Sequence, residues 1–144
     1  MVTLTLEKEH GYAIAVAISS VPIMIWAAVK VVKARTKYNV PVPTMYADSS
    51  NPHATEFNCV QRAHQNILEN YPPFLLLMTT GSIFHPGVAA VLGAIRLNGF
   101  IFYVRGYSKG IPDKRRNVFS MLGYLGLFGL LGLSIDSSIR LIRQ

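Results

Sequence analysis

Charged residues are scarce in this chain, and they are absent from three long stretches. Only 15% of the 144 residues are Asp, Glu, Lys or Arg, whereas a soluble domain usually carries about 25%. No charged residue occurs in residues 11–29, 70–95 or 117–135. Each stretch approaches or exceeds the length of about 20 residues that an α-helix needs to cross a bilayer. The composition therefore argues against an ordinary soluble domain and favours an integral membrane protein.

Cysteine is nearly missing too, because Cys59 is the single one in the chain. One cysteine excludes an internal disulfide framework, and a buried thiol on a helix is more often a packing residue than a reactive one. The four histidines, at positions 10, 53, 64 and 85, do not have the spacing of metal ligands, so no metal is expected. The length allows one domain, which we expect to cover residues 1–144.

The net charge of +7 raises the question of a nucleic-acid partner. The basic residues, however, cluster at the ends of the apolar stretches. Nine lie in or beside the first and third connections, at positions 30, 33, 35, 37, 105, 109, 114, 115 and 116, while three lie near the termini and none in the second connection. Basic residues concentrate on the cytosolic side of membrane proteins. We therefore expect cytosolic first and third loops and no nucleic acid.

The chain divides into four helices, which we expect at about residues 11–38, 56–84, 88–107 and 117–140. Segments rich in proline, glycine and serine separate them, including VPVPT and SKGIPDKRR. A cleaved secretory signal is the alternative for the first helix, but the acidic residues before it and the spans after it favour an uncleaved helix. The predicted fold is an all-α membrane protein, a four-transmembrane-helix up-and-down bundle with both termini on one side.

Arg62, Asn66 and Glu69 form a polar stripe on the second helix. Their spacings of four and three place them on one helical face. A charged side chain in mid-bilayer costs at least about 2.5–3.5 kcal/mol, so this face must be shielded from lipid. An Arg–Glu pair bridged by Asn66 and a site for a polar ligand are both consistent with the spacing.

Tyr103 and Tyr107 lie one turn apart near the cytosolic end of the third helix, and Lys114, Arg115 and Arg116 follow in the loop. Interfacial tyrosines and topology charges would explain each feature alone. Together with the polar stripe they suit a small zwitterionic peptide, because arginine forks match carboxylates and a glutamate matches an ammonium group. A basic group near a thiol also favours the thiolate, which is the nucleophile.

The motif FNCVQRAHQNILENYPPF, with KARTKYNVPVP before it and YVRGYSKGIPDKR after it, closely resembles the MAPEG superfamily of membrane glutathione enzymes. Within that superfamily, the type 3 microsomal glutathione S-transferases look nearest. The resemblance covers the whole chain. It implies a homotrimer with glutathione bound between neighbouring subunits near the cytosolic face. The implied location is the endoplasmic reticulum membrane, with the outer mitochondrial membrane as the alternative.

The resemblance also assigns roles to individual residues. Arg115 matches the arginine that holds the glutathione thiolate, although this alignment needs one inserted residue, which leaves Lys114 and Arg116 as alternatives. The residues that match glutathione contacts are Arg35, Arg62, His64, Asn66, Glu69, Tyr103 and Tyr107.

Three positions depart from the pattern of relatives, two of them from that of the leukotriene-synthase branch. Asn70 stands where that branch has a tyrosine, and Thr36 where it has a second arginine. Both argue against leukotriene C4 synthesis as the dominant activity. Relatives also carry an arginine at the position of Phe100, while Arg96 lies one turn earlier here. Whether Arg96 substitutes for it is left open.

The expected function is that of a glutathione transferase with glutathione as co-substrate. The thiolate would attack a lipophilic electrophile or reduce a lipid hydroperoxide, as in a glutathione peroxidase, and the apolar substrate would arrive from the membrane lipid. One alternative is a non-catalytic lipid-binding member like the 5-lipoxygenase-activating protein, which lacks the helix-two arginine and has aspartate in place of the glutamate. The other alternative is a small channel or transporter subunit.

Overall fold

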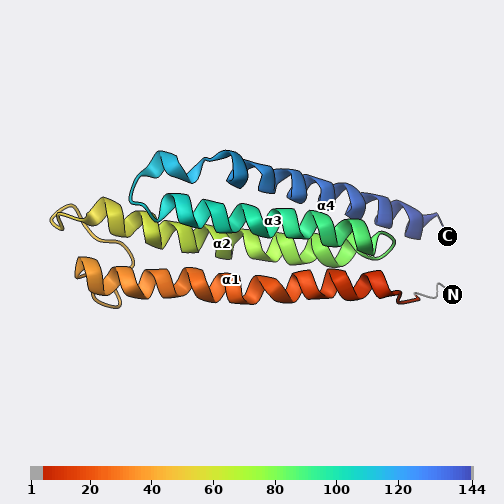
Figure 1. The fold of residues 1–144 in the computed structure, drawn as a ribbon, viewed down its shortest axis with the longest axis horizontal. Helices are drawn as coiled ribbons and strands as arrows, with labels where there is room; N and C mark the ends of the chain where they lie inside the picture. Colours follow the sequence, from red (N-terminus) through yellow and green to blue (C-terminus); the bar gives the residue numbers. More distant parts are fainter. Residues whose placement is uncertain (1–4, 144) are drawn as a thin grey trace.

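Residues 5–143, which the computed structural model describes, form four long α-helices and one short 3₁₀-helix, and they contain no β-strand. The elements in chain order are α1 (Lys8–Tyr38), α2 (Ala54–Gly81), α3 (Pro86–Tyr107), η1 (Pro112–Arg115) and α4 (Val118–Ile142). The four long helices lie side by side and alternate in direction, so that the start of α1 and the end of α4 share one end of the bundle (Figure 1). The predicted all-α fold is confirmed.

Three helices in the described part of the chain, α1, α3 and α4, are long and apolar enough to cross a membrane. Helix α2 has the length for a span, with 28 residues, but its polar stripe lowers its hydropathy. It packs against all three of the other helices and runs alongside them (Figure 1). Helix α2 therefore lies at the same depth as the spans, and its polar face is held there by the apolar helices around it.

The helix ends follow local chemistry and differ from the expected bounds by a few residues. Glu7 and His10 form a reciprocal capping box that starts α1, and Asn39 ends that helix in the left-handed region with φ of 53°. The expected helices leave residues 85–87 as a connection, but Pro86 is the first residue of α3. Proline is well suited to that position because its fixed φ is helical and its missing N–H is not needed there.

Helices α3 and α4 approach closely because glycines line their contact. A Cβ atom built on Gly99 would lie 2.6 Å from the Cα of Gly123. A Cβ atom on Gly126 would lie 2.4 Å from the carbonyl oxygen of Leu92. Small residues allow such close packing of membrane helices, where no hydrophobic effect drives their association. This contact sets the distance between Tyr103 on α3 and the side chains of α4.

The connection between α1 and α2 is folded onto the bundle by side-chain amides. Asn58 accepts a hydrogen bond from the amide of Ala47 at 2.8 Å and donates one to its carbonyl at 2.9 Å. Within the loop, the hydroxyl of Ser50 and then its amide donate to the Asp48 carboxylate and lower the pKa of that group. The loop is therefore an ordered cover over one end of α2.

Candidate functional site

One cavity brings together residues from α2, α3, α4 and the loop before α4. It has a volume of about 600 Å³, and we refer to it as the Arg115 cavity. Besides Arg116, an alternative for the thiolate role, its lining includes three of the predicted site residues, namely Asn66, Tyr103 and Arg115. These residues are 37 and 12 positions apart in the chain. The fold therefore assembles part of the predicted site within a single subunit.

Arg115 is held in place from both sides. The hydroxyl of Ser120 donates a hydrogen bond of 2.9 Å to the Arg115 carbonyl, which anchors the end of η1 to the first turn of α4. The guanidinium lies 5.5 Å from the centre of the Tyr107 ring, and its Nη1 is 3.5 Å from the Tyr107 hydroxyl. Tyr107 in turn packs edge-on against Tyr103, with 5.7 Å between the ring centres. The two tyrosines thus buttress the arginine at the cavity.

Arg62 and Glu69 form a two-point ion pair along α2. Nη1 and Nη2 of Arg62 donate to the two Glu69 oxygens at 2.7 and 3.1 Å. Asn66 does not bridge them as one interpretation proposed, because they meet directly. The two side chains are 40% and 45% exposed. A pair this open on a membrane helix has room to contact a ligand or a second subunit.

Arg35 and His64 are not part of the Arg115 cavity. Arg35 turns back onto its own loop, where Nη1 donates to the Thr44 carbonyl at 2.7 Å and the guanidinium lies 5.3 Å from the Phe57 ring. His64 is half-buried on α2 and does not line the cavity. Arg62, Glu69 and Tyr107 do not line this cavity either, although Tyr107 contacts Arg115.

The side chains that α4 contributes were missed by sequence analysis. Ser120, Met121, Tyr124 and Phe128 line the Arg115 cavity, and the rings of Tyr124 and Phe128 stack at 6.4 Å. Their spacing of three or four residues would have placed them on one face of α4. The glycine-rich, apolar character of that stretch gave no reason to prefer that face over the others.

Arg96 occupies the interior of the bundle, behind the cavity. Arg96 is 4% exposed, and its Nη2 donates to the side-chain oxygen of Asn70 at 2.9 Å. The guanidinium lies 4.3 Å from the Phe100 ring and 5.2 Å from the Tyr124 ring. Asn70 also donates to the Asn66 carbonyl at 2.8 Å. Arg96 thus supports the polar stripe from the α3 side.

The three neighbouring basic residues of the loop do not face the same way. Arg115 and Arg116 line the Arg115 cavity, whereas Lys114 lines a different cavity between α1, α3 and the loop. Arg116 also lines that second cavity, so the structure sets Lys114 apart from Arg115, while the choice between Arg115 and Arg116 stays a prediction. Residues 5–143 contain no group of three or more His, Cys, Asp or Glu side chains that could hold a metal ion.

Fold and cavity define a helical integral membrane protein with a polar site near one end of its spans. The chain belongs to the MAPEG family, whose family model matches residues 13–135. It is 36% identical over 119 residues to microsomal glutathione S-transferase 2 of Homo sapiens, and the matched region covers 82% of this chain and 77% of the relative. It is 25% identical over 142 residues to leukotriene C4 synthase of Bos taurus, which covers 94% and 91%.

A third relative is leukotriene C4 synthase of Rattus norvegicus, at 30% identity over 110 residues, covering 76% of this chain and 69% of the relative. The predicted membership of MAPEG is therefore confirmed. The expected nearness to the type 3 enzymes stays a prediction, because these three relatives carry other names within the same family.

Proposed function

We propose that this protein is a glutathione-dependent membrane transferase. The observation that carries the proposal is the Arg115 cavity, in which an amide, a phenol and a guanidinium from three elements meet. Relatives named as glutathione S-transferase and leukotriene C4 synthase support glutathione as the co-substrate. The set of side chains suits that tripeptide, which offers two carboxylates, one ammonium group and one thiol.

In this proposal Arg115 lies beside the glutathione sulfur and stabilises its thiolate. Tyr107 holds the Arg115 guanidinium from behind. Tyr103 and Asn66 form hydrogen bonds with the peptide. Glu69 receives the ammonium group, while Arg62 remains its partner and binds a carboxylate. Arg35 and His64, which lie outside the cavity of their own subunit, contact the peptide bound by a neighbouring copy.

The chemical step is a displacement or addition at carbon. The thiolate lone pair forms the new carbon–sulfur bond. A leaving group departs with the electrons of the bond that breaks, or an activated double bond takes up the electrons and then a proton from water. Before this step the thiol proton passes to solvent at the open end of the cavity. The lipophilic electrophile enters from the bilayer along the exposed apolar face of α4, where Leu125 and Phe128 lie.

The half-exposed Arg62–Glu69 pair is the reason to place the site between subunits. An ion pair on a membrane helix is costly to leave against lipid, and a second copy would cover it. We therefore propose a homotrimer. We also propose the endoplasmic reticulum as its membrane, with the basic loops and the Arg115 cavity on the cytosolic side.

Replacing Arg115 by alanine tests the proposed chemistry. A free thiol has a pKa near 8.5, so bound glutathione without a nearby cation should be mostly protonated at pH 7. Turnover at pH 7 with a chloro-nitroaromatic substrate should fall about ten-fold or more, equivalent to ~1.4 kcal/mol per ten-fold. It should partly recover as the pH rises. Glutathione affinity at low pH should stay within a few-fold, and thiolate absorbance of the complex should titrate at higher pH.

Lys114→Ala is the matched control. It removes the same charge from the neighbouring residue, whose side chain lines another cavity. It should leave the thiolate titration unchanged. A shift with Arg116→Ala alone would transfer the role to that neighbour. Absence of glutathione-dependent turnover in the unmodified protein, with chloro-nitroaromatic and fatty-acid hydroperoxide substrates alike, would contradict the proposal and favour a lipid-binding role.

A further inference from the structure

A second cavity, the basic cavity, lies between α1, α3 and the loop before α4. It has a volume of about 680 Å³ and contains five basic residues and one acidic residue, Asp113. The basic residues are Lys30 from α1, Arg105 and Lys109 from the end of α3, and Lys114 and Arg116 from the loop. None of the glutathione contacts predicted from the sequence lines it.

The basic cavity depends on a close contact within the fold. A Cβ atom on Gly106 would lie 2.1 Å from the Lys114 carbonyl oxygen, so only glycine lets the loop pack this tightly on α3. Asn117 then donates to the Phe102 carbonyl at 3.2 Å and fixes the other side of the loop. These contacts hold cations from separate parts of the chain around one space. Basic residues that only set the membrane topology would not need such a fixed arrangement.

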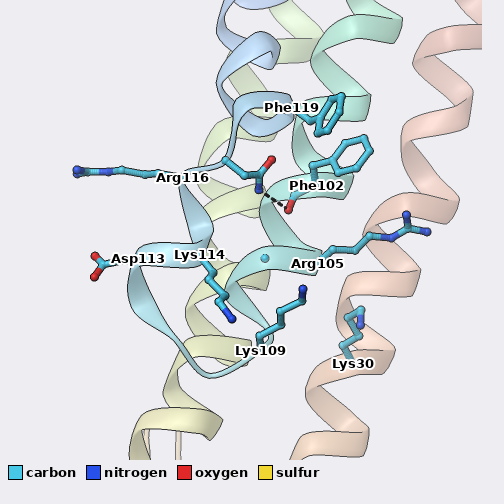
Figure 2. Close-up of a pocket in the computed structure, with 10 residues that line it drawn as sticks. Lys30, Phe102, Arg105, Lys109, Asp113, Lys114, Arg116 and Phe119 are labelled. Atoms are coloured by element: carbon cyan, nitrogen blue, oxygen red, sulfur yellow. Dashed lines mark hydrogen bonds between the residues drawn. The ribbon is translucent and has the colours of Figure 1, made fainter.

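The basic side chains come from different elements (Figure 2). Lys109 and Lys114 extend toward the same space, and Arg105 reaches across toward α1, where Lys30 lies. Asp113 points away from these four cations, as does Arg116. In the described part of the chain, none of Lys30, Arg105, Lys109 and Lys114 forms a salt bridge with a carboxylate. Their charge is available to an anion from outside.

A smaller cavity continues the positive surface along α1. Lys30 lines both cavities, and Lys33 and Lys37 line the smaller one together with Ser108. The Ser108 hydroxyl oxygen is buried and has no hydrogen-bond partner among residues 5–143. A buried hydroxyl without a partner is costly.

The surroundings of the basic cavity are those of a membrane surface. Phe102 and Phe119 line it and stack on each other at 4.6 Å. Phe119, Val118 and Leu122 on α4 and Val29 on α1 are exposed apolar side chains next to it along the spans. A ligand here would meet cations at one end and apolar surface at the other.

We propose that the basic cavity binds the phosphate headgroup of an anionic phospholipid, with the acyl chains lying against α1 and α4. Basic clusters at the cytosolic ends of membrane helices attract anionic lipids. The headgroup phosphate accepts from Arg105, Lys109 and Lys30. An apolar contact continuous with the cavity distinguishes a lipid from a free phosphate ion.

Native mass spectrometry of the detergent-purified protein, titrated with phosphatidic acid or phosphatidylcholine, tests the proposal. The protein should retain phosphatidic acid at least ten-fold more tightly. The double variant Arg105→Gln/Lys109→Gln should lose at least ten-fold of that affinity. Lys8→Gln/Arg143→Gln is the matched control, because it removes the same charge from exposed positions at the other end of the bundle and should bind as the unmodified protein does.

Competing inorganic phosphate separates the two sources of this chemistry. Millimolar phosphate should leave the bound phosphatidic acid in place, whereas displacement would show a site for the free ion and overturn the lipid assignment. Equal binding of both lipids, or equal losses in the test and control variants, would also overturn it. Should the first pair fail to fold, Lys30→Gln/Lys109→Gln probes the same cavity. Glutathione-dependent turnover should persist in these variants, so this test is independent of the proposed function.

Discussion

At the scale of single residues, the polar stripe combines an internal ion pair with exposed polar atoms. Each Glu69 oxygen accepts one bond from Arg62, and a carboxylate has about four lone-pair sites in all. Glu69 can therefore hold Arg62 and meet an ammonium group at once. Removing the charge of Glu69 alone should therefore distinguish a purely structural ion pair from one that also binds the ligand.

Glu69→Gln keeps the size of the side chain and removes its charge. Glutathione binding should weaken by about 1.5–3 kcal/mol, the range for a hydrogen bond to a charged group. Isothermal titration of the detergent-solubilised protein measures this loss. Glu56→Gln, a neutralised glutamate earlier on the same helix, serves as the control. Unchanged affinity in Glu69→Gln would reduce Glu69 to a partner of Arg62.

The bond between Arg96 and Asn70 is a second residue-scale feature with a measurable strength. Arg96→Met and Asn70→Leu should each destabilise the protein, since the first leaves the half-buried Asn70 amide and the second the buried Arg96 guanidinium without its partner. The double variant should lose about 1.5–3 kcal/mol less than the sum of the two, as expected for a hydrogen bond to a charged group. Unfolding in mixed detergent micelles measures the cycle. Additive losses would mean that the two side chains act independently.

At the scale of elements, the close contact between α3 and α4 positions the Arg115 cavity. Tyr103 comes from one helix and Tyr124 from the other, so the glycines between the helices set how far apart the two walls stand. The same helix α4 carries Gly132, where an added Cβ atom would meet nothing within 4 Å. Two glycines on one helix therefore allow a matched comparison.

Gly126→Ala should destabilise the bundle by roughly 1–3 kcal/mol, the usual cost of overpacking, because the new Cβ would collide with the Leu92 carbonyl. Gly132→Ala should be neutral or stabilise slightly, since alanine has the higher helix propensity. Thermal unfolding of both variants in one detergent gives the comparison. Equal effects would show that α3 and α4 do not pack as closely as described.

At the scale of the whole molecule, the bundle leaves polar and apolar surfaces that one subunit cannot satisfy alone. Helix α1 exposes Ile14, Ile18, Val21 and Ile25, which suit lipid or another subunit. Helix α2 exposes the Arg62–Glu69 pair, which does not suit lipid. The residues predicted to contact one ligand also do not meet at one place in a single subunit, since Arg35 lies away from the Arg115 cavity.

We therefore expect a stable homotrimer with the polar stripe at the subunit contacts. Native mass spectrometry or chemical crosslinking in mild detergent should give the trimer as the main species. Arg62→Leu/Glu69→Leu, which removes the ion pair, should alter this distribution or abolish glutathione binding. A protein that remains monomeric and still binds glutathione would contradict the placement of the site between subunits.

Much of the fold and part of the site could be predicted from the sequence. The number of helices and their alternating direction followed from three features: the charge-free stretches, the positions of proline and glycine, and the asymmetry of basic residues. Each of these features acts locally or through the membrane. The i, i+3 and i+4 spacings placed Arg62 with Glu69 and Tyr103 with Tyr107 for the same reason. Family resemblance named Arg115, which spacing alone did not distinguish from Lys114 and Arg116.

Tertiary structure alone decided which side chains meet across helices. Three features depend on how α3, α4 and η1 pack: the contribution of Tyr124, the bond between Arg96 and Asn70, and the placing of Lys114 and Arg115 at different cavities. The basic cavity likewise exists because Gly106 lets the loop approach α3. Local sequence determines where helices begin and which residues share a face, whereas contacts between distant residues depend on packing distances that no spacing along one helix encodes.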